Sequence, residues 1–448
     1  MRSRFTRVMT PALALSLVSC DPTSPDPQAV VDFFLGFCPT DAPQWLAYKN
    51  TGGNWTAFSL DANSNATIKV TSKFALAFVT DYGTDVQTLV FYATTNELSP
   101  LASGACEDAN FGSRSANGSV SGLLSGEFAD VSMAGSSAFV FAGGTTTFSL
   151  LGLPDAGAMD LVAIRSNSSG VPSSIIVRRD QNPTSGATMS PLNFGAGEAI
   201  APAVGTLSFS GNGSDDLFFF SSFTTGNGTN AFFFPGQPGA SSTTIYGVPA
   251  SLTLATDIHM VDVSAYPLSG DYARSVVMFN RDVGNRTATL GALPNTPSFT
   301  VEATSPLRVR TNLIGQSDYN GLVAVEFDQS PPGYDRYYTI AMTSGYAGAN
   351  PAEWVLEMPD LDAAGIPTAA SLTGTSVPTE WYVTMTSAAP QTAFSSTAPD
   401  GSSFKFAYLS SPQGAAGPGG FGPGSLRRPS ALETAARINP FRPRRGGR

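Results

Sequence analysis

The single histidine of this 448-residue chain is the first candidate for catalysis. His259 follows Asp257 by two residues, so on a strand the two side chains would share a face. A Ser-His-Asp triad is formally available, but the G-x-S-x-G elbow that would carry the serine is missing. One histidine also excludes the H-E-x-x-H motif and most zinc sites, and there is no P-loop. The sequence therefore predicts no catalytic residue, no metal and no cofactor.

Carboxylates offer a second route to chemistry. A glycosidase needs two carboxyl groups at a set separation and no histidine. Nothing in the sequence pairs the acids of the predicted strands, so an envelope hydrolase acting on glycans is kept as the alternative interpretation. The acids available for it are Glu198, Glu302, Glu326, Asp328 and Glu353.

An Asp/Asn-rich segment imitates the start of a calcium loop. Asp61, Asn63 and Asn65 have the spacing of the first ligands, but Ala66 stands where glycine is needed and Ser72 where the bidentate Glu should be. We interpret the segment as a polar connection between strands.

The first 20 residues are typical of an export signal. Three arginines precede an apolar stretch, residues 8–18, which is shorter than the roughly 20 residues that span a bilayer. Leu17-Val18-Ser19-Cys20 resembles the lipobox of bacterial lipoproteins. That resemblance implies that Cys20 is lipidated and anchors the chain to a membrane of the bacterial cell envelope, on its periplasmic face or outer surface. An ordinary secretory signal is the other interpretation.

The other two cysteines suit a disulfide in an oxidising compartment. If Cys20 is lipidated, Cys38 and Cys106 remain as a pair that brackets the first predicted module. Closing this loop would stabilise the fold by roughly 4 kcal/mol in the chain-entropy model.

Charge divides the chain into an acidic body and a basic end. Residues 21–426 hold 14 basic and 33 acidic residues, whereas the last 22 residues hold seven arginines and one acid. The acidic body argues against nucleic acid as a partner, because phosphates require a basic surface. The basic end follows a Gly/Pro-rich linker and is interpreted as a solvated, disordered tail. The alternative is attraction to anionic lipid or polymer, or to the acidic body itself.

Short alternating segments predict an all-β fold. Residues 45–49 and 55–60 flank a Gly-Gly turn and predict a hairpin. Residues 217–223 and 231–234 predict another, and each of these arms carries three consecutive phenylalanines. Because side chains alternate, aromatics must lie on both faces of this hairpin. Either both faces are buried, which we favour, or one is exposed for binding.

One segment resembles a known module. Gly118-Ser119-Val120-Ser121-Gly122, a strand near 129–133, Phe148-Ser149-Leu150, Gly152-Leu153-Pro154 and a strand at 160–163 resemble the carboxypeptidase regulatory-like family, a small transthyretin-like β-sandwich. The resemblance implies a structural or adhesive role without catalysis. An inward face is predicted for Val120, Val131, Phe148, Leu150 and Leu161. The order of parts also resembles predicted lipoproteins of GC-rich bacteria.

The resulting prediction is several β-sandwich modules in tandem, with a disordered N-terminal tether and C-terminal tail. The boundaries are signal peptide 1–19, tether 20–30, β-module 31–110, regulatory-like sandwich 115–168, β-domains 170–300 and 301–410, and tail 411–448.

The favoured function is that of a non-enzymatic cell-envelope lipoprotein that binds or scaffolds polysaccharide or envelope protein. A self-associating surface-layer component is a further hypothesis. The first candidates for ligand contact, each with core packing as the favoured alternative, are Trp45, Trp55, Trp354 and Trp381.

Overall fold

The computed structural model describes residues 30–37, 42–102, 112–233, 241–267, 272–331, 333–375, 377–388 and 398–411. Strands dominate these residues, so the all-β prediction is confirmed. None of the described helices is long and apolar enough to cross a membrane. Cys20, Cys38 and Cys106 lie outside the described residues, as do the signal peptide, nearly all of the tether and the tail from residue 412.

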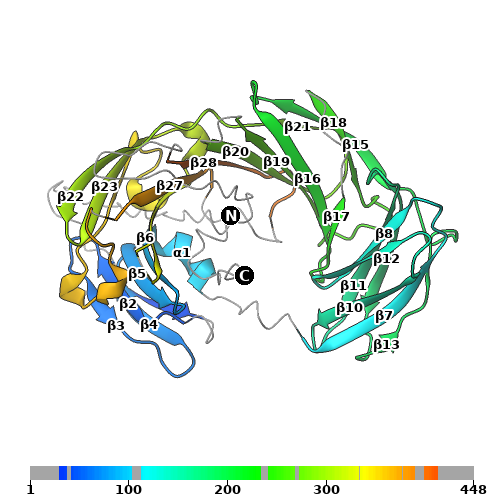
Figure 1. The fold of residues 1–448 in the computed structure, drawn as a ribbon, viewed down its shortest axis with the longest axis horizontal. Coiled ribbons are helices and arrows are strands. Elements are labelled where there is room, and N and C mark those ends of the chain that lie inside the picture. The colour runs from blue at the N-terminus through cyan, green and yellow to red at the C-terminus, as the bar shows by residue number, and fades with distance from the viewer. Residues whose placement is uncertain are drawn as a thin grey trace, which may run out of the picture.

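One 12-stranded sheet forms the frame of the molecule and curves across Figure 1. Its strands, in spatial order, are β17 (Asn230–Phe233), β16 (Asp216–Thr224), β19 (Ile258–Tyr266), β20 (Tyr272–Asn280), β28 (Ser403–Ser410), β27 (Thr379–Thr386), β24 (Leu322–Gln329), β25 (Asp335–Thr343), β6 (Asp85–Thr94), β5 (Lys73–Asp81), β2 (Trp45–Asn50) and β3 (Thr56–Phe58).

Two local hairpins of this sheet were predicted. β2 pairs with β3, with Leu46 opposite Phe58, and β16 pairs with β17, with Ser222 opposite Phe232. Both hairpins are antiparallel and join segments that are adjacent in sequence. Their prediction is therefore confirmed.

Small sheets cover the outer side of the frame (Figure 1). β15 (Ala203–Ser210), β18 (Ser242–Gly247) and β21 (Arg286–Thr289) form one, and β22 (Ser298–Thr304), β23 (Leu307–Ile314) and β26 (Glu353–Glu357) form the other. Each buries an apolar face against the frame, because side chains point alternately to the two faces of a strand. The larger of the two cores contains Val309, Leu313, Val323, Phe327, Ile340 and Trp354.

The inner side is covered at one end of the frame. β1 (Val31–Gly36) pairs with β4 (Asn65–Val70), and α1 (Thr95–Ala102) lies beside them. Leu35, Val70 and Leu98 pack there with Leu76 and Phe91 of the frame. Short helical segments connect other strands: η3 (Ser317–Tyr319), α2 (Ser344–Ala347), η4 (Asp362–Ala364) and η5 (Thr368–Ala370).

A separate β-sandwich lies at the other end of the arc, on the right in Figure 1. One layer is β12 (Pro172–Gln181), β11 (Met159–Ser166), β8 (Phe128–Met133) and β9 (Ser136–Phe141). The other is β10 (Thr147–Leu153) and β7 (Arg114–Ser121) with the short strands β13 (Ala187–Thr188) and β14 (Leu192–Asn193). The five residues predicted to face inward, Val120, Val131, Phe148, Leu150 and Leu161, all lie in its core.

Strand pairing crosses the predicted domain boundaries. β12 belongs to the sandwich because it pairs along its length with β11, although the boundary was placed at about residue 169. The boundary at residue 300 also divides one sheet, since β20 pairs with β28. The first predicted module joins the same sheet through the parallel pair β6 and β25. The long-range pairings therefore correct the boundaries that local sequence signals indicated.

Candidate functional site

A row of exposed phenylalanines lies on the inner face of the β16–β17 hairpin. Phe218 is 59% exposed and Phe232 is 41% exposed, and the Phe220 ring lies between exposure and burial. The Phe220 and Phe232 ring centroids are 6.4 Å apart. Full burial of a phenylalanine stabilises a fold by roughly 1.5–3 kcal/mol. Much of this stabilisation is absent at each exposed ring. We call Phe218, Phe220 and Phe232 the phenylalanine row.

The opposite face of the same hairpin is core. Phe219 packs under the outer sheet, and Phe223 and Phe233 pack against the sandwich. The sequence left open whether both faces of this hairpin are buried, and buried packing was favoured. The structure buries the outer face and exposes two of the three rings on the inner face.

The inner face beside the row also carries a buried carboxyl group. Asp262 on β19 lies directly opposite Phe220, and its side chain is only 2% exposed. Its hydrogen bond comes from Ser264 Oγ at 3.2 Å, and Ser264 Oγ lies 2.7 Å from Ser275 Oγ. Burial raises the pKa of Asp262 to about 7. No sequence signal identified this group, since a lone acid within an apolar strand looks like an ordinary outward-facing position.

His259 is a structural residue in this fold. Its ring is 4% exposed and lies 4.8 Å from the ring of Phe223. Nε2 accepts a hydrogen bond from the Val248 backbone N–H at 3.0 Å. Burial lowers the pKa of His259 to about 4, so the imidazole is neutral near pH 7. With Nε2 occupied by a backbone donor, it is poorly placed to act as a base.

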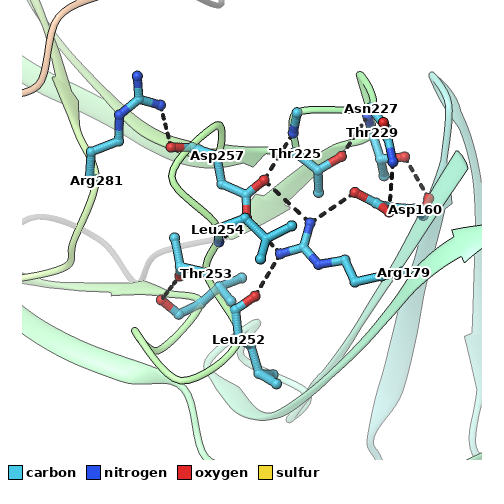
Figure 2. A network of polar contacts seen from close by, with 12 residues as sticks. Asp160, Arg179, Thr225, Asn227, Thr229, Leu252, Thr253, Leu254, Asp257 and Arg281 are labelled. Carbon is cyan, nitrogen blue, oxygen red and sulfur yellow. Dashed lines mark hydrogen bonds and ion pairs between the residues drawn. The ribbon is translucent and has the colours of Figure 1, made fainter.

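Asp257 joins a polar network that ties the sandwich to the frame (Figure 2). Arg179 of β12 lies between two buried carboxylates: its Nη1 is 2.8 Å from Asp160 Oδ2, and its Nη2 is 2.5 Å from Asp257 Oδ2. Gly226 and Leu254 donate backbone hydrogen bonds to Asp257 at 2.9 and 2.7 Å. The partners of Asp257 are therefore those of a structural anion.

The Asp160 end of this network is equally satisfied. Burial alone would raise the pKa of Asp160, but hydrogen bonds from the Asp180 backbone, Arg179 and Asn227 hold it below its usual range. Apolar contacts surround the network, with Val162, Ile164 and Ile175 of the sandwich packed against Phe223, Ala231 and Phe233 of the frame. We call this combination of polar and apolar contacts the junction.

Of the carboxylates considered for glycan hydrolysis, Glu326 and Asp328 share one face of β24, and the others lie on different strands or loops. Glu198 pairs with Arg178 at 2.9 Å, and Glu353 accepts from Asn312 Nδ2 at 2.8 Å. Glu326 accepts from Thr339 at 3.1 Å, on the same strand as Asp328.

Glu302 has Glu357 as a carboxyl neighbour, and Asp328 has Glu380 opposite it on β27. Slight burial, and then the charge of Glu357 and a hydrogen bond with it, raise the pKa of Glu302. This pair lies on the exposed face of the β22–β23–β26 sheet.

The four tryptophans pack with the core. Trp354 and Trp381 are 1% and 7% exposed and belong to the largest apolar cluster. Trp45 and Trp55 are half-buried against the same cluster, and Trp45 Nε1 donates to the Ala364 carbonyl at 3.2 Å. Trp354 and Trp381 are therefore core residues, whereas Trp45 and Trp55 are partly exposed.

The described residues offer no cluster suited to a metal ion, and a small cavity lies near the β22–β23–β26 sheet. The described residues contain no group of three His, Cys, Asp or Glu side chains that could hold a metal ion. Asp61 Oδ1 instead accepts backbone hydrogen bonds from Asn63 and Asn65, as expected of a turn. A cavity of about 150 Å³ lies beside Leu307, Met358 and Leu372. Ligand pockets usually measure about 300–1,000 Å³, so this cavity is small.

Comparisons with known proteins leave the chain without an assigned family. No family model matches it, and neither does any curated protein. One similar solved structure is a "tetra-tandem repeat in extending region of large adhesion protein". It is 12% identical, the match covers 83% of this chain and 92% of that chain, and the TM-score is 0.12. At this TM-score the similarity carries no argument about fold or function.

Proposed function

We propose that this chain is a non-catalytic binding protein of a bacterial cell envelope, anchored through Cys20, whose frame presents the phenylalanine row to a partner. The row carries the proposal, because large aromatic side chains left exposed on a rigid sheet favour an interaction surface over a catalytic one. The lipobox-like sequence before Cys20 supports the location.

The chemistry of the row favours an envelope protein over a polysaccharide. Phenylalanine has no polar tip, so it offers apolar area without the hydrogen bonds by which tyrosine and tryptophan also bind hydroxyl-rich ligands. The neighbouring inner-face side chains Ser222 and Ser264 are buried and so add little exposed polarity. An apolar patch on a partner protein is therefore the better match.

A double substitution tests this proposal. Phe218→Ser/Phe232→Ser should reduce binding to detergent-solubilised envelope proteins at least tenfold. The matched control is Phe139→Ser/Phe141→Ser, which alters two exposed rings on β9 of the sandwich, 47% and 60% exposed. Equal binding by both variants and the native chain would contradict the proposal. Loss of glycan-array binding alone would identify a polysaccharide as the partner.

The anchor has its own test. Cys20→Ser should move the chain from the membrane fraction to the soluble fraction, since the acyl chains supply the membrane affinity. Mass spectrometry of the mature N-terminal peptide should show acylated Cys20. An unmodified N-terminus elsewhere would identify an ordinary secretory signal.

Glycan hydrolysis remains the weaker candidate. One carboxyl pair, Glu302 and Glu357, lies on an exposed sheet face and shares a hydrogen bond. Retaining and inverting glycosidases hold their carboxyl groups about 5 Å or more apart across a bound sugar. The placement of this pair therefore favours binding over hydrolysis.

A further inference from the structure

A second inner-face surface, separate from the phenylalanine row, combines acids and tyrosines in the middle of the frame. Four neighbouring strands, β6, β25, β24 and β27, contribute the carboxylates Asp85, Asp335, Glu326, Asp328 and Glu380. Tyr337, Tyr382 and Tyr408 lie on the same face of β25, β27 and β28. We call these eight residues the tyrosine–acid face, in which Glu326 and Tyr408 are buried, at 7% and 8% exposed, beneath the other six.

Like charges stand directly opposite one another on this face. Asp328 is the cross-strand neighbour of Glu380, and Asp335 is that of Asp85. Such pairs are destabilising by themselves. Among the described residues, Asp85, Asp335 and Glu380 form no ion pair with a lysine or arginine. These three carboxylates therefore give the face a negative charge that no basic side chain of the described residues pairs with.

The tyrosines lie close enough to the carboxylates for the negative charge to affect a tyrosine pKa. Their rings also offer flat surfaces on which guanidinium groups can stack. Burial and the charges of Asp328, Asp335, Asp85 and Glu326 raise the pKa of Tyr337 to about 12. The Tyr382 and Tyr408 rings stack 5.8 Å apart with planes 25° apart. Arginine pairs with carboxylates through its planar fork and also stacks on aromatic rings, whereas lysine does so less well.

The chain supplies a matching segment at the edge of this face. β28 ends at Ser410, which is the cross-strand neighbour of Tyr382, and the Ser411 N–H donates to the Trp381 carbonyl at 3.0 Å. Residues 412–448 follow directly, and they contain seven arginines, no lysine and a single acid.

The linker before the arginines is long enough for them to reach the tyrosine–acid face. Fifteen residues of Gly/Pro-rich chain separate the sheet from the first arginine, Arg427. A flexible linker of this length spans roughly 20 Å. The five strands of the face, from β28 to β6, extend over about 19 Å, because strands lie about 4.8 Å apart. The arginines can therefore cover the whole tyrosine–acid face without leaving their own molecule.

We propose that the arginine-rich segment, residues 427–448, docks in cis on the tyrosine–acid face and neutralises its opposed carboxylates. This contact is independent of the phenylalanine row and of the proposed function.

Limited trypsin digestion of the full chain in detergent tests the contact, because docking should protect the cleavable bonds after Arg427, Arg437, Arg444 and Arg445. The bonds after Arg428 and Arg442 precede prolines and resist trypsin in any state. Release of the tail, followed by mass spectrometry, should be slow at about 0.01 M salt and fast at about 1 M, where the Debye length is only about 3 Å. Asp85→Asn/Asp335→Asn should speed release about tenfold at low salt. The matched control Glu302→Gln/Glu357→Gln neutralises another adjacent acid pair and should leave the rate unchanged.

A tail-side variant guards against misfolding of the sheet variant. Arg444→Glu/Arg445→Glu leaves the frame intact and should speed cleavage after Arg427 and Arg437 several-fold. Equal cleavage rates in the native chain and both variants would overturn the proposal. So would protection that disappears on dilution, which would assign the contact to a second copy. Protection that requires phosphatidylglycerol vesicles would place the segment on lipid and overturn it as well.

Discussion

At the scale of single residues, Arg179 links the sandwich to the frame. It neutralises Asp160 and Asp257, whose side chains are 2% and 0% exposed. It also donates to the Leu252 carbonyl at 2.6 Å. Removing one member of such a group leaves buried charge without compensation, which is far more destabilising than losing an exposed pair.

Arg179→Ala should therefore lower the free energy of unfolding by about 3–5 kcal/mol. Lys69→Ala is the control, because Lys69 and its partner Asp32 are 75% and 65% exposed. An exposed pair of that kind contributes about 0–1 kcal/mol. Urea denaturation of both variants measures the difference, and similar losses would show that Arg179 does not bridge the junction.

Asp262 gives the stability of the fold a pH dependence. Burial raises its pKa from 3.8 to about 7, so between these values the folded chain keeps a proton that the unfolded chain has lost. The stabilisation of the fold by protonated Asp262 is fully present below pH 3.8 and is lost as the pH rises through about 7.

Asp262→Asn should remove this dependence. The native chain should lose stability relative to the variant between pH 5 and pH 8, and the difference between the two isolates this one group. Chemical denaturation at both pH values checks it. A parallel shift of the two proteins would mean that Asp262 ionises normally in the fold.

At the scale of elements, the Gly118-x-Val120-x-Gly122 segment has a packing explanation. Gly118 lies directly opposite Phe148 on the paired strand, and a Cβ added to Gly118 would lie 2.3 Å from the end of the phenyl ring. The ring therefore covers the glycine, and the motif is explained by close packing within one layer of the sandwich.

Gly118→Ala should destabilise the sandwich by about 1–3 kcal/mol, which is typical of an overpacked core. Gly144→Ala is the control, because the nearest atom to its added Cβ is 3.5 Å away. Thermal unfolding compares the two. Equal melting temperatures would mean that the Phe148 ring moves aside without cost.

Element-scale prediction succeeded where the signal was local. The two hairpins follow from alternation and turn residues that lie together in the sequence. Which face of a hairpin is covered depends on strands elsewhere in the chain, so the exposure of Phe218 and the burial of Phe219 could not be derived. For the same reason the tryptophans drew attention as candidate contacts, although packing decides their positions.

At the scale of the whole molecule, the long sheet joins early and late parts of the chain. β6 and β25 are parallel neighbours although Asp85 and Asp335 are 250 residues apart. Pairing over such a separation leaves no local sequence signal, and loop-closure entropy grows only slowly with length. This explains why the all-β class could be predicted and the module boundaries could not.

Fragments should behave according to the observed pairing. Residues 112–200 contain the whole sandwich core and should fold alone. Residues 115–168 lack Ile176, Leu192 and Phe194, which are fully or nearly fully buried in that core, and should not. Cooperative thermal melting followed by circular dichroism distinguishes the two, and a cooperative transition in the shorter fragment would contradict the observed module.

The most direct test of the account is photo-crosslinking from the phenylalanine row in living cells. A photoreactive phenylalanine analogue at position 218 should give a discrete adduct with one envelope partner. The same analogue at Leu151, which is 67% exposed on the sandwich, should not. Adducts of equal yield from both positions, or none from position 218, would contradict the claim that the row is the binding surface.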